Sequence, residues 1–147
     1  MNLSWSRQLA LMEGLLNVSV AWLMITILPY SFWRRRLGRI FDIQELPKDL
    51  NPPAPDQDSV ILDVAWAHAA IKRRFSMIFT CLMLGFSARS MLRRRGYQSI
   101  IVLGVGRRDR DESSVLGAHA WVIHNSTDIV GGDDRGDFSA VAAYGDF

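Results

Sequence analysis

The hydrophobic pattern of the chain changes at Gly96, and this change limits the possible folds more than any other feature. Upstream of it, Leu82, Phe86 and Arg93 follow one another at helical spacing. Downstream, residues 99–105 form a short apolar run rich in β-branched side chains, which is typical of a buried strand. A helix followed by strands predicts an α+β fold, with helices and sheet in separate layers.

Two more segments of strand character follow the first. In residues 119–124 the odd-numbered side chains, including His119, share one face, and the even-numbered ones, including His124, share the other. Residues 125–130 contain a turn that leads into another apolar pair, as in an antiparallel hairpin. We expect the charged residues 107–114 to form a loop between the first and second strands. The sequence therefore predicts a small antiparallel sheet after the helix.

The predicted helix has start and stop signals that give Cys81 a particular environment. If Thr80 is the N-cap, Cys81 lies in the first turn, where unpaired N–H groups and the positive end of the helix dipole stabilise a thiolate. Basic residues 93–95 complement the opposite end of the dipole, and Gly96 is suited to a left-handed C-terminal cap. Reactive cysteines are typically found in such positions.

A thiol, an imidazole and a carboxylate follow one another along the chain. The thiolate is the nucleophile, and an ordinary thiol with a pKa of about 8.5 is mostly protonated at neutral pH. A neighbouring imidazole can take the proton and return it to a leaving amine, while a carboxylate fixes the orientation of the ring. Cys81, His119 and Asp133 are our candidates for these three roles, with Asp134 or Asp128 as alternatives for the third.

The remaining candidate motifs are weak. One cysteine and histidines at positions 68, 119 and 124 lack the ligand spacing of a metal site. The pair Gly104 and Gly106 lacks the rest of a dinucleotide fingerprint. We therefore expect neither a metal nor a cofactor, and we interpret His68 as structural. Without its helix-start position and the His119 segment, Cys81 would be interpreted as a small buried hydrophobe.

The N-terminal part is apolar and is followed by a proline-rich segment. Residues 14–33 carry no charge, precede three arginines at 34–36, and are long enough to span a bilayer. Because polar side chains and a proline dilute their apolarity, we expect a helix packed on the core or on a partner, with peripheral membrane contact as the alternative. The predicted organisation is an apolar helical segment at 1–46, a linker at 47–58 and a catalytic core at 59–147, within one compact domain.

The composition is typical of one globular domain. The chain has 147 residues, of which 49% are hydrophobic and 22% charged. A single cysteine can form no internal disulfide, and the start lacks the pattern of a signal peptide, so we expect a cytoplasmic protein, with membrane association as the alternative. The net charge is +2 and the basic residues are bunched, which we interpret as solvated helix ends and loops, with a site for an acidic partner or a membrane surface as the alternative. We expect no nucleic-acid partner.

Several motifs together resemble one family. They are Trp33-Arg34-Arg35-Arg36-Leu37-Gly38, Trp66-Ala67, Cys81-Leu82, residues 91–97, Leu103-Gly104-Val105, Ala118-His119-Ala120-Trp121-Val122, Val130-Gly131-Gly132, Phe138 and Ala142-Ala143-Tyr144. At these positions the sequence resembles the B2 proteins of lasso peptide biosynthesis, which are small transglutaminase-like cysteine peptidases. The resemblance covers nearly the whole chain.

The resemblance implies a transglutaminase/papain-like core in which the helix bearing Cys81 packs on a small antiparallel sheet. It implies removal of the leader segment from a ribosomally synthesised lasso precursor peptide, before a separate cyclase acts, through an acyl-enzyme formed by Cys81, His119 and Asp133. It also implies a separate leader-recognition module as partner, because we see none in this sequence. Related sequences offer an acid about a dozen positions after the histidine, where this chain has Gly131 and Gly132.

Two other functions stay open at this stage. Acyl transfer to an amine uses the same three groups, as the transglutaminase fold does in crosslinking. A noncatalytic, membrane-associated scaffold would instead use residues 14–33 and bury Cys81.

Overall fold

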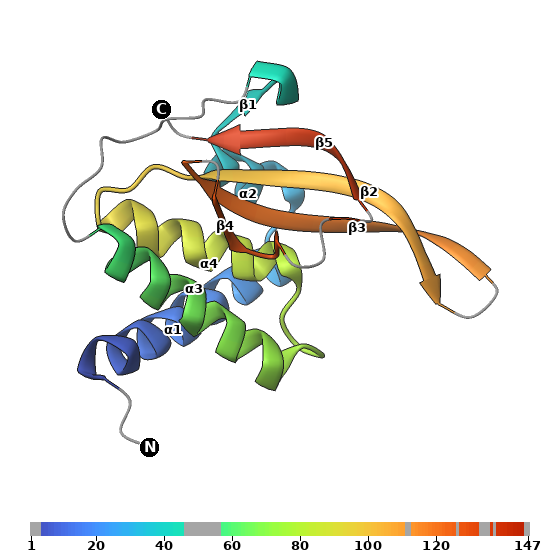
Figure 1. Cartoon of the computed structure of the whole chain (residues 1–147). Coiled ribbons are helices and arrows are strands. Elements are labelled where there is room, and N and C mark those ends of the chain that lie inside the picture. Colours follow the sequence, from blue (N-terminus) through green and yellow to red (C-terminus); the bar gives the residue numbers. More distant parts are fainter. Residues whose placement is uncertain are drawn as a thin grey trace.

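A layer of helices packs on one face of an antiparallel sheet (Figure 1). The computed structural model describes residues 4–45, 57–110, 113–125, 127–132, 136 and 138–145. Within these ranges the helices are α1 (Trp5–Ile27), α2 (Tyr30–Leu37), α3 (Gln57–Phe75) and α4 (Cys81–Arg94), with a short 3-10 turn at Ile43–Glu45. The strands are β1 (Arg39–Phe41), β2 (Ile100–Arg110), β3 (Ser113–His124), β4 (Thr127–Val130) and β5 (Phe138–Gly145). The predicted α+β class is confirmed.

Helix α4 begins and ends where the sequence predicts. The Thr80 side chain accepts a hydrogen bond from the backbone N–H of Met83 at 3.4 Å, which is the contact expected of an N-cap. At the other end Gly96 has a φ of 81°, and the N–H of Tyr97 donates to the carbonyl of Leu92 at 2.9 Å. This is a Schellman motif and ends the helix, while the Thr80 cap makes Cys81 its first residue.

The five strands lie in the order β1-β5-β2-β3-β4, and each neighbouring pair is antiparallel. The expectation of a loop at residues 107–114 is wrong, because β2 continues to Arg110 and β3 already begins at Ser113. Arg107 pairs with Leu116 in an unbroken register. Backbone hydrogen bonds sustain this extension of the hairpin, so it needs no apolar pattern in the sequence. The predicted turn after His124 is confirmed by the β3–β4 pairing.

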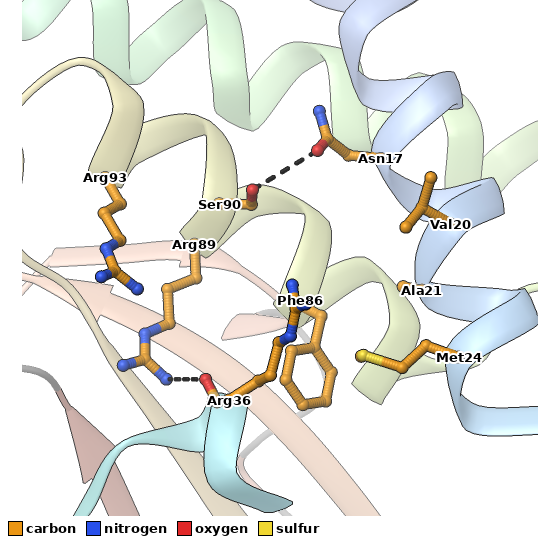
Figure 2. Close-up of a pocket in the computed structure, with 9 residues that line it drawn as sticks. All are labelled: Asn17, Val20, Ala21, Met24, Arg36, Phe86, Arg89, Ser90 and Arg93. Atoms are coloured by element: carbon orange, nitrogen blue, oxygen red, sulfur yellow. Dashed lines mark hydrogen bonds between the residues drawn. The ribbon is translucent and has the colours of Figure 1, made fainter. Parts of the chain in front are cut away.

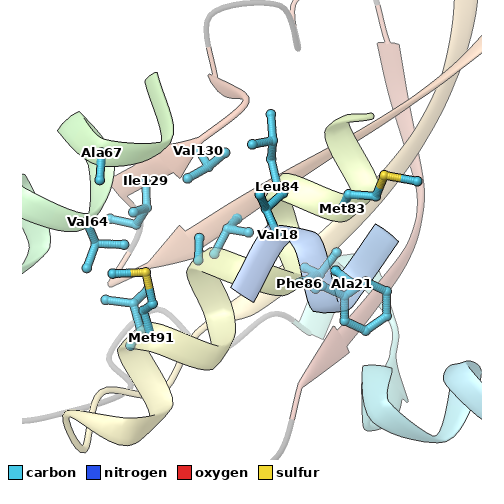
Figure 3. Close-up of a cluster of buried hydrophobic side chains, with 14 of the residues drawn as sticks. Val18, Ala21, Val64, Ala67, Met83, Leu84, Phe86, Met91, Ile129 and Val130 are labelled. Atoms are coloured by element: carbon cyan, nitrogen blue, oxygen red, sulfur yellow. The ribbon is translucent and has the colours of Figure 1, made fainter. Parts of the chain in front are cut away.

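The main core lies between the helices and one face of the sheet (Figure 3). We call this the helix-side cluster; among its buried members are Val18, Ala21, Val64, Ala67, Met83, Leu84, Phe86, Met91, Ala120, Val122, Ile129 and Val130. A smaller outer-face cluster contains Ile100, Val102, Trp121 and Ala143. The alternation predicted for residues 119–124 is confirmed, because Ala120 and Val122 belong to one cluster and Trp121 to the other.

The N-terminal apolar segment forms two helices rather than one, with α1 ending before Pro29 and α2 following it. One face of α1 packs against α3 and α4 and buries Gly14, Asn17 and Val18, among others. Among the described residues, α1 is the one helix long and apolar enough to cross a membrane, and 28% of its most apolar stretch is buried inside the molecule. Most of the predicted linker, residues 47–56, lies outside the described residues, and α3 already begins at Gln57.

Candidate active site

Cys81 is the first residue of α4 and is half-buried. Its side chain packs at the margin of the helix-side cluster. The first turn of a helix presents backbone N–H groups that have no partner within the helix. The thiol therefore lies beside donors that can stabilise negative charge on the sulfur or on a nearby oxygen.

His119 lies on β3 and is 4% exposed. Its ring is stacked on Trp121, with centroids 5.9 Å apart, and is tilted against Phe138 of β5 at 5.0 Å. Nε2 donates a hydrogen bond to the backbone carbonyl of Gly131 at 2.7 Å. The ring is thus held by two aromatic neighbours and one hydrogen bond.

That hydrogen bond determines which nitrogen of His119 can act as a base. A carbonyl oxygen only accepts hydrogen bonds, so Nε2 carries the proton, and in the neutral ring Nδ1 keeps its lone pair. Nδ1 is buried and has no hydrogen-bond partner among the described residues. Buried polar atoms are nearly always paired, so this nitrogen needs an explanation, and a catalytic role is one such explanation. In the neutral ring Nδ1 is the nitrogen that has a lone pair to accept a proton.

Gly131 can place its carbonyl against His119 only because it is glycine. It directly follows Val130, the last residue of β4, and has a φ of 79°. A Cβ at this position would lie 2.6 Å from the carbonyl oxygen of Ala120 and 3.2 Å from the Cβ of Trp121. The backbone therefore passes β3 too closely for any side chain, and this close approach brings the carbonyl to the imidazole.

The topology places His119 toward the Cys81 end of α4. At the other end, Nδ1 of His124 donates to the carbonyl of Gln98 at 2.5 Å, just beyond the last turn of the helix. The hairpin then runs back along α4 (Figure 1). From His124 to His119 the strand covers about 17 Å, and α4 is about 20 Å long. His124 is thereby separated from Cys81 by the length of the helix.

The contact between the sulfur of Cys81 and the ring of His119 stays a prediction. No hydrogen bond joins the sulfur of Cys81 to the ring of His119 within the described part of the chain. His119 shares a strand face with Trp121 of the outer-face cluster, whereas Cys81 borders the helix-side cluster.

One of the three predicted carboxylates, that of Asp128, lies within the described residues. Asp133 and Asp134 lie outside the described residues. Asp128 lies on β4 and lines a cavity of about 210 Å³ between α3 and the segment after β4, together with Gly131 and Gly132. Nε2 of His119 is bonded to Gly131 and not to Asp128. The residue types of the sequence do not identify this carbonyl, although a glycine at the position where the resemblance expects an acid was a signal for it.

His68 has the structural environment that the sequence suggested. Its Nδ1–H donates to the carbonyl of Val64 at 2.8 Å, and Nε2 lies 2.8 Å from the hydroxyl of Ser87. That hydroxyl is 3.2 Å from the carbonyl of Gly14, so the network connects α1, α3 and α4. Burial lowers the pKa of His68 to about 4, against the opposing effects of the Val64 hydrogen bond and the charge of Glu13. Within the described ranges, no three His, Cys, Asp or Glu side chains are grouped to hold a metal ion.

Comparison with known families identifies the fold. Residues 24–143 match the model of the transglutaminase-like superfamily, and this match includes Cys81, His119 and Gly131. Comparisons with curated proteins and with solved structures give no match.

Proposed function

The chain belongs to the transglutaminase-like superfamily, and from this premise we propose that it is a cysteine peptidase that removes the leader segment from a ribosomally synthesised lasso precursor peptide before cyclisation. The superfamily supports a fold of the cysteine peptidase or acyl-transfer type. The observation that carries the proposal is the buried Nδ1 of His119, which has no partner among the described residues while Nε2 is held.

In the proposed reaction, the Cys81 thiolate attacks the carbonyl carbon of the bond joining leader to core. N–H groups at the start of α4 donate to the resulting oxyanion, and such donors contribute about 10²- to 10³-fold in rate. His119 delivers its proton to the departing amine of the core peptide, which leaves the leader bound to sulfur as a thioester. His119 then takes a proton from water, which attacks the thioester and releases the leader as a carboxylic acid.

Gly131 has a defined part in this mechanism. Its carbonyl holds the Nε2–H tautomer, so that Nδ1 is the nitrogen that takes and returns the proton. The carbonyl continues to accept the same hydrogen bond from Nε2 when the ring becomes positively charged. A carbonyl carries only a partial negative charge, so it stabilises the charged ring less than a carboxylate would. We assign Asp133, two residues later in the chain, the remaining role of an acid near the ring.

The proposal includes a set of partners. The substrate is the precursor peptide, recognition of its leader comes from a separate module, and the freed amine is the substrate of a lasso cyclase. We place the reaction in the cytoplasm, because the only thiol of the chain must stay reduced to act.

Leader release is the direct test. The protein is incubated with precursor and recognition module, and the products are followed by mass spectrometry. Cys81→Ala and His119→Ala should abolish cleavage. The matched control is His124→Asn, which changes another buried histidine of β3 at the far end of α4 and should still cleave. Cleavage by Cys81→Ala at the rate of the unaltered protein would overturn the assignment.

The same experiment separates the second candidate. Acyl transfer to an amine is favoured by the superfamily, whose fold serves both reactions. Hydrolysis adds water to the leader, whereas transfer adds the mass of the amine. A product carrying an added amine would replace the peptidase assignment with a transferase.

A further inference from the structure

An apolar stripe runs along the full length of α1 on the face turned away from α3 and α4. We call it the α1 stripe, and its members are Trp5, Leu9, Met12, Leu16, Val20, Leu23 and Ile27. Between 47% and 74% of each residue is exposed. Scattered exposed apolar residues are ordinary, but a continuous row of this length indicates a contact surface.

The spacing of the α1 stripe indicates a flat contact. Its members repeat after 11 residues, from Trp5 to Leu16 to Ile27. At about 100° per residue they fall within a sector of roughly 80°, so the stripe stays on one side of a straight helix about 34 Å long. A left-handed coiled coil would require an apolar residue at position 19, where the chain has Ser19.

The charges of α1 are directed away from this stripe. Glu13, its one acidic residue, faces α4, with its carboxylate 2.6 Å from Arg95 and 3.5 Å from Arg94. These arginines hold the pKa of Glu13 below its ordinary value, so it stays ionised and paired. Because the opposite face of α1 is buried against α3 and α4, the helix presents the stripe to a surface along its length.

Basic side chains border one end of the α1 stripe. Arg34, Arg35 and Arg36 of α2 are exposed, and none of them forms an ion pair with another described residue. Arg36 and Phe32 line an apolar groove of about 420 Å³ together with Val20, Leu23 and Ile27. The guanidinium group of Arg36 is therefore next to the exposed apolar side chains, and Arg34 and Arg35 lie on the same short helix.

A second cavity, of about 120 Å³, adjoins this groove through shared residues such as Arg36 (Figure 2). Arg89 and Arg93 of α4 also line it, and Asn17 and Ser90 supply neutral polar groups. Figure 2 shows the Arg36 side chain beside Phe86, between α4 and α2. Three guanidinium groups around a small cavity favour an anionic group such as a phosphate.

We propose that the face formed by α1 and α2 binds the surface of a bilayer that contains anionic lipids. α1 lies in the plane of the interface, with its stripe among the upper parts of the acyl chains, and Arg34, Arg35 and Arg36 contact the lipid phosphates. A bilayer meets both requirements at once, since it offers a flat apolar layer and a dense array of anions.

Vesicle sedimentation tests the charge requirement with the full chain. The protein should bind vesicles of phosphatidylcholine mixed with phosphatidylglycerol and should be released by salt, while vesicles of phosphatidylcholine alone bind far less. Replacing Arg34, Arg35 and Arg36 with Gln should weaken partitioning on the order of 100-fold. The matched control replaces Lys72, Arg73 and Arg74 at the end of α3, which removes the same charge and should cost much less.

A second pair of variants tests the apolar requirement. Leu16→Gln should weaken vesicle binding about tenfold. The control Leu62→Gln changes a leucine of similar exposure on α3, 61% against 64%, and should bind as the parent does. Failure to bind mixed vesicles, or equal losses for variant and control, would overturn the proposal. So would a stable dimer that Leu16→Gln dissociates in the absence of vesicle binding, since this face would then join two copies of the chain.

Discussion

His68 in the helical layer and His119 on the sheet are both buried, but they differ in how their ring nitrogens are satisfied. Both nitrogens of His68 lie 2.8 Å from a partner, in a network that connects three helices. His119 has a partner for Nε2 and none for Nδ1 among the described residues. The two histidines therefore share burial and differ in the pairing of one ring nitrogen, and the proposed mechanism uses this difference.

The difference follows from the surroundings of each ring. His68 is enclosed by helices whose backbone carbonyls and Ser87 hydroxyl reach it from several directions. His119 lies where β4 has already ended, and among the described residues that follow, Gly131 contributes a carbonyl to Nε2. Nδ1 of His119 thus has no partner among the described residues beside the short strand β4.

The largest expected effect distinguishes the two histidines directly. His119→Ala should lower the rate of leader cleavage by about 10³-fold or more, because it removes the base and the acid together. His68→Asn should leave the rate per folded molecule within about threefold. Cleavage kinetics corrected for the folded fraction, measured by circular dichroism, make the comparison. If both variants lost the same fraction of the cleavage rate, the two histidines would not differ in their contribution to catalysis.

Gly131→Ala should affect stability as well as activity. The new Cβ must occupy a left-handed backbone position 2.6 Å from the Ala120 carbonyl oxygen, so we expect unfolding to become easier by about 2–4 kcal/mol. Urea denaturation measures this change. The control is Gly136→Ala, where a Cβ would meet nothing within 4 Å and the cost should stay below about 0.5 kcal/mol. A tolerated Gly131→Ala would contradict the close approach described above.

His68 should make stability depend on pH. Its pKa of about 4 in the folded protein is below the ordinary 6.5, so the unfolded chain binds more protons between these two values. Stability is therefore complete above pH 6.5 and falls by about 3 kcal/mol as the pH drops to 4. Urea denaturation across this range should show the loss, and His68→Gln should flatten it. If the free energy of unfolding of His68→Gln fell with pH as steeply as that of the unaltered protein, another titratable group would cause the loss.

The smallest effect concerns the acids after β4. Because Gly131 already holds the ring, Asp133→Asn should lower cleavage by about tenfold at most, compared with about 10⁴-fold where a carboxylate alone fixes the tautomer. Asp134→Asn is the matched control and should change nothing measurable. A loss for Asp133→Asn as large as that of His119→Ala would return the whole orienting role to the carboxylate.

The sequence was informative wherever a local signal determined the structure. The caps at Thr80 and Gly96 set the bounds of α4, and alternation assigned residues 119–124 to their faces. The extension of the hairpin and the Gly131 carbonyl were missed for one reason: both consist of backbone hydrogen bonds, which depend on pairing between distant segments and leave little trace in side-chain identity. For the site, residue types could be named in advance, but not the atom that holds His119.

The most direct test of the account is the alkylation rate of Cys81, the only cysteine in the chain, with iodoacetamide at mildly acidic pH. If His119 serves this thiol as its base, the unaltered protein should react at least about tenfold faster than His119→Ala, with both proteins shown to be folded. Equal rates in the two proteins would show that the imidazole does not act on the sulfur, and would contradict the proposed mechanism.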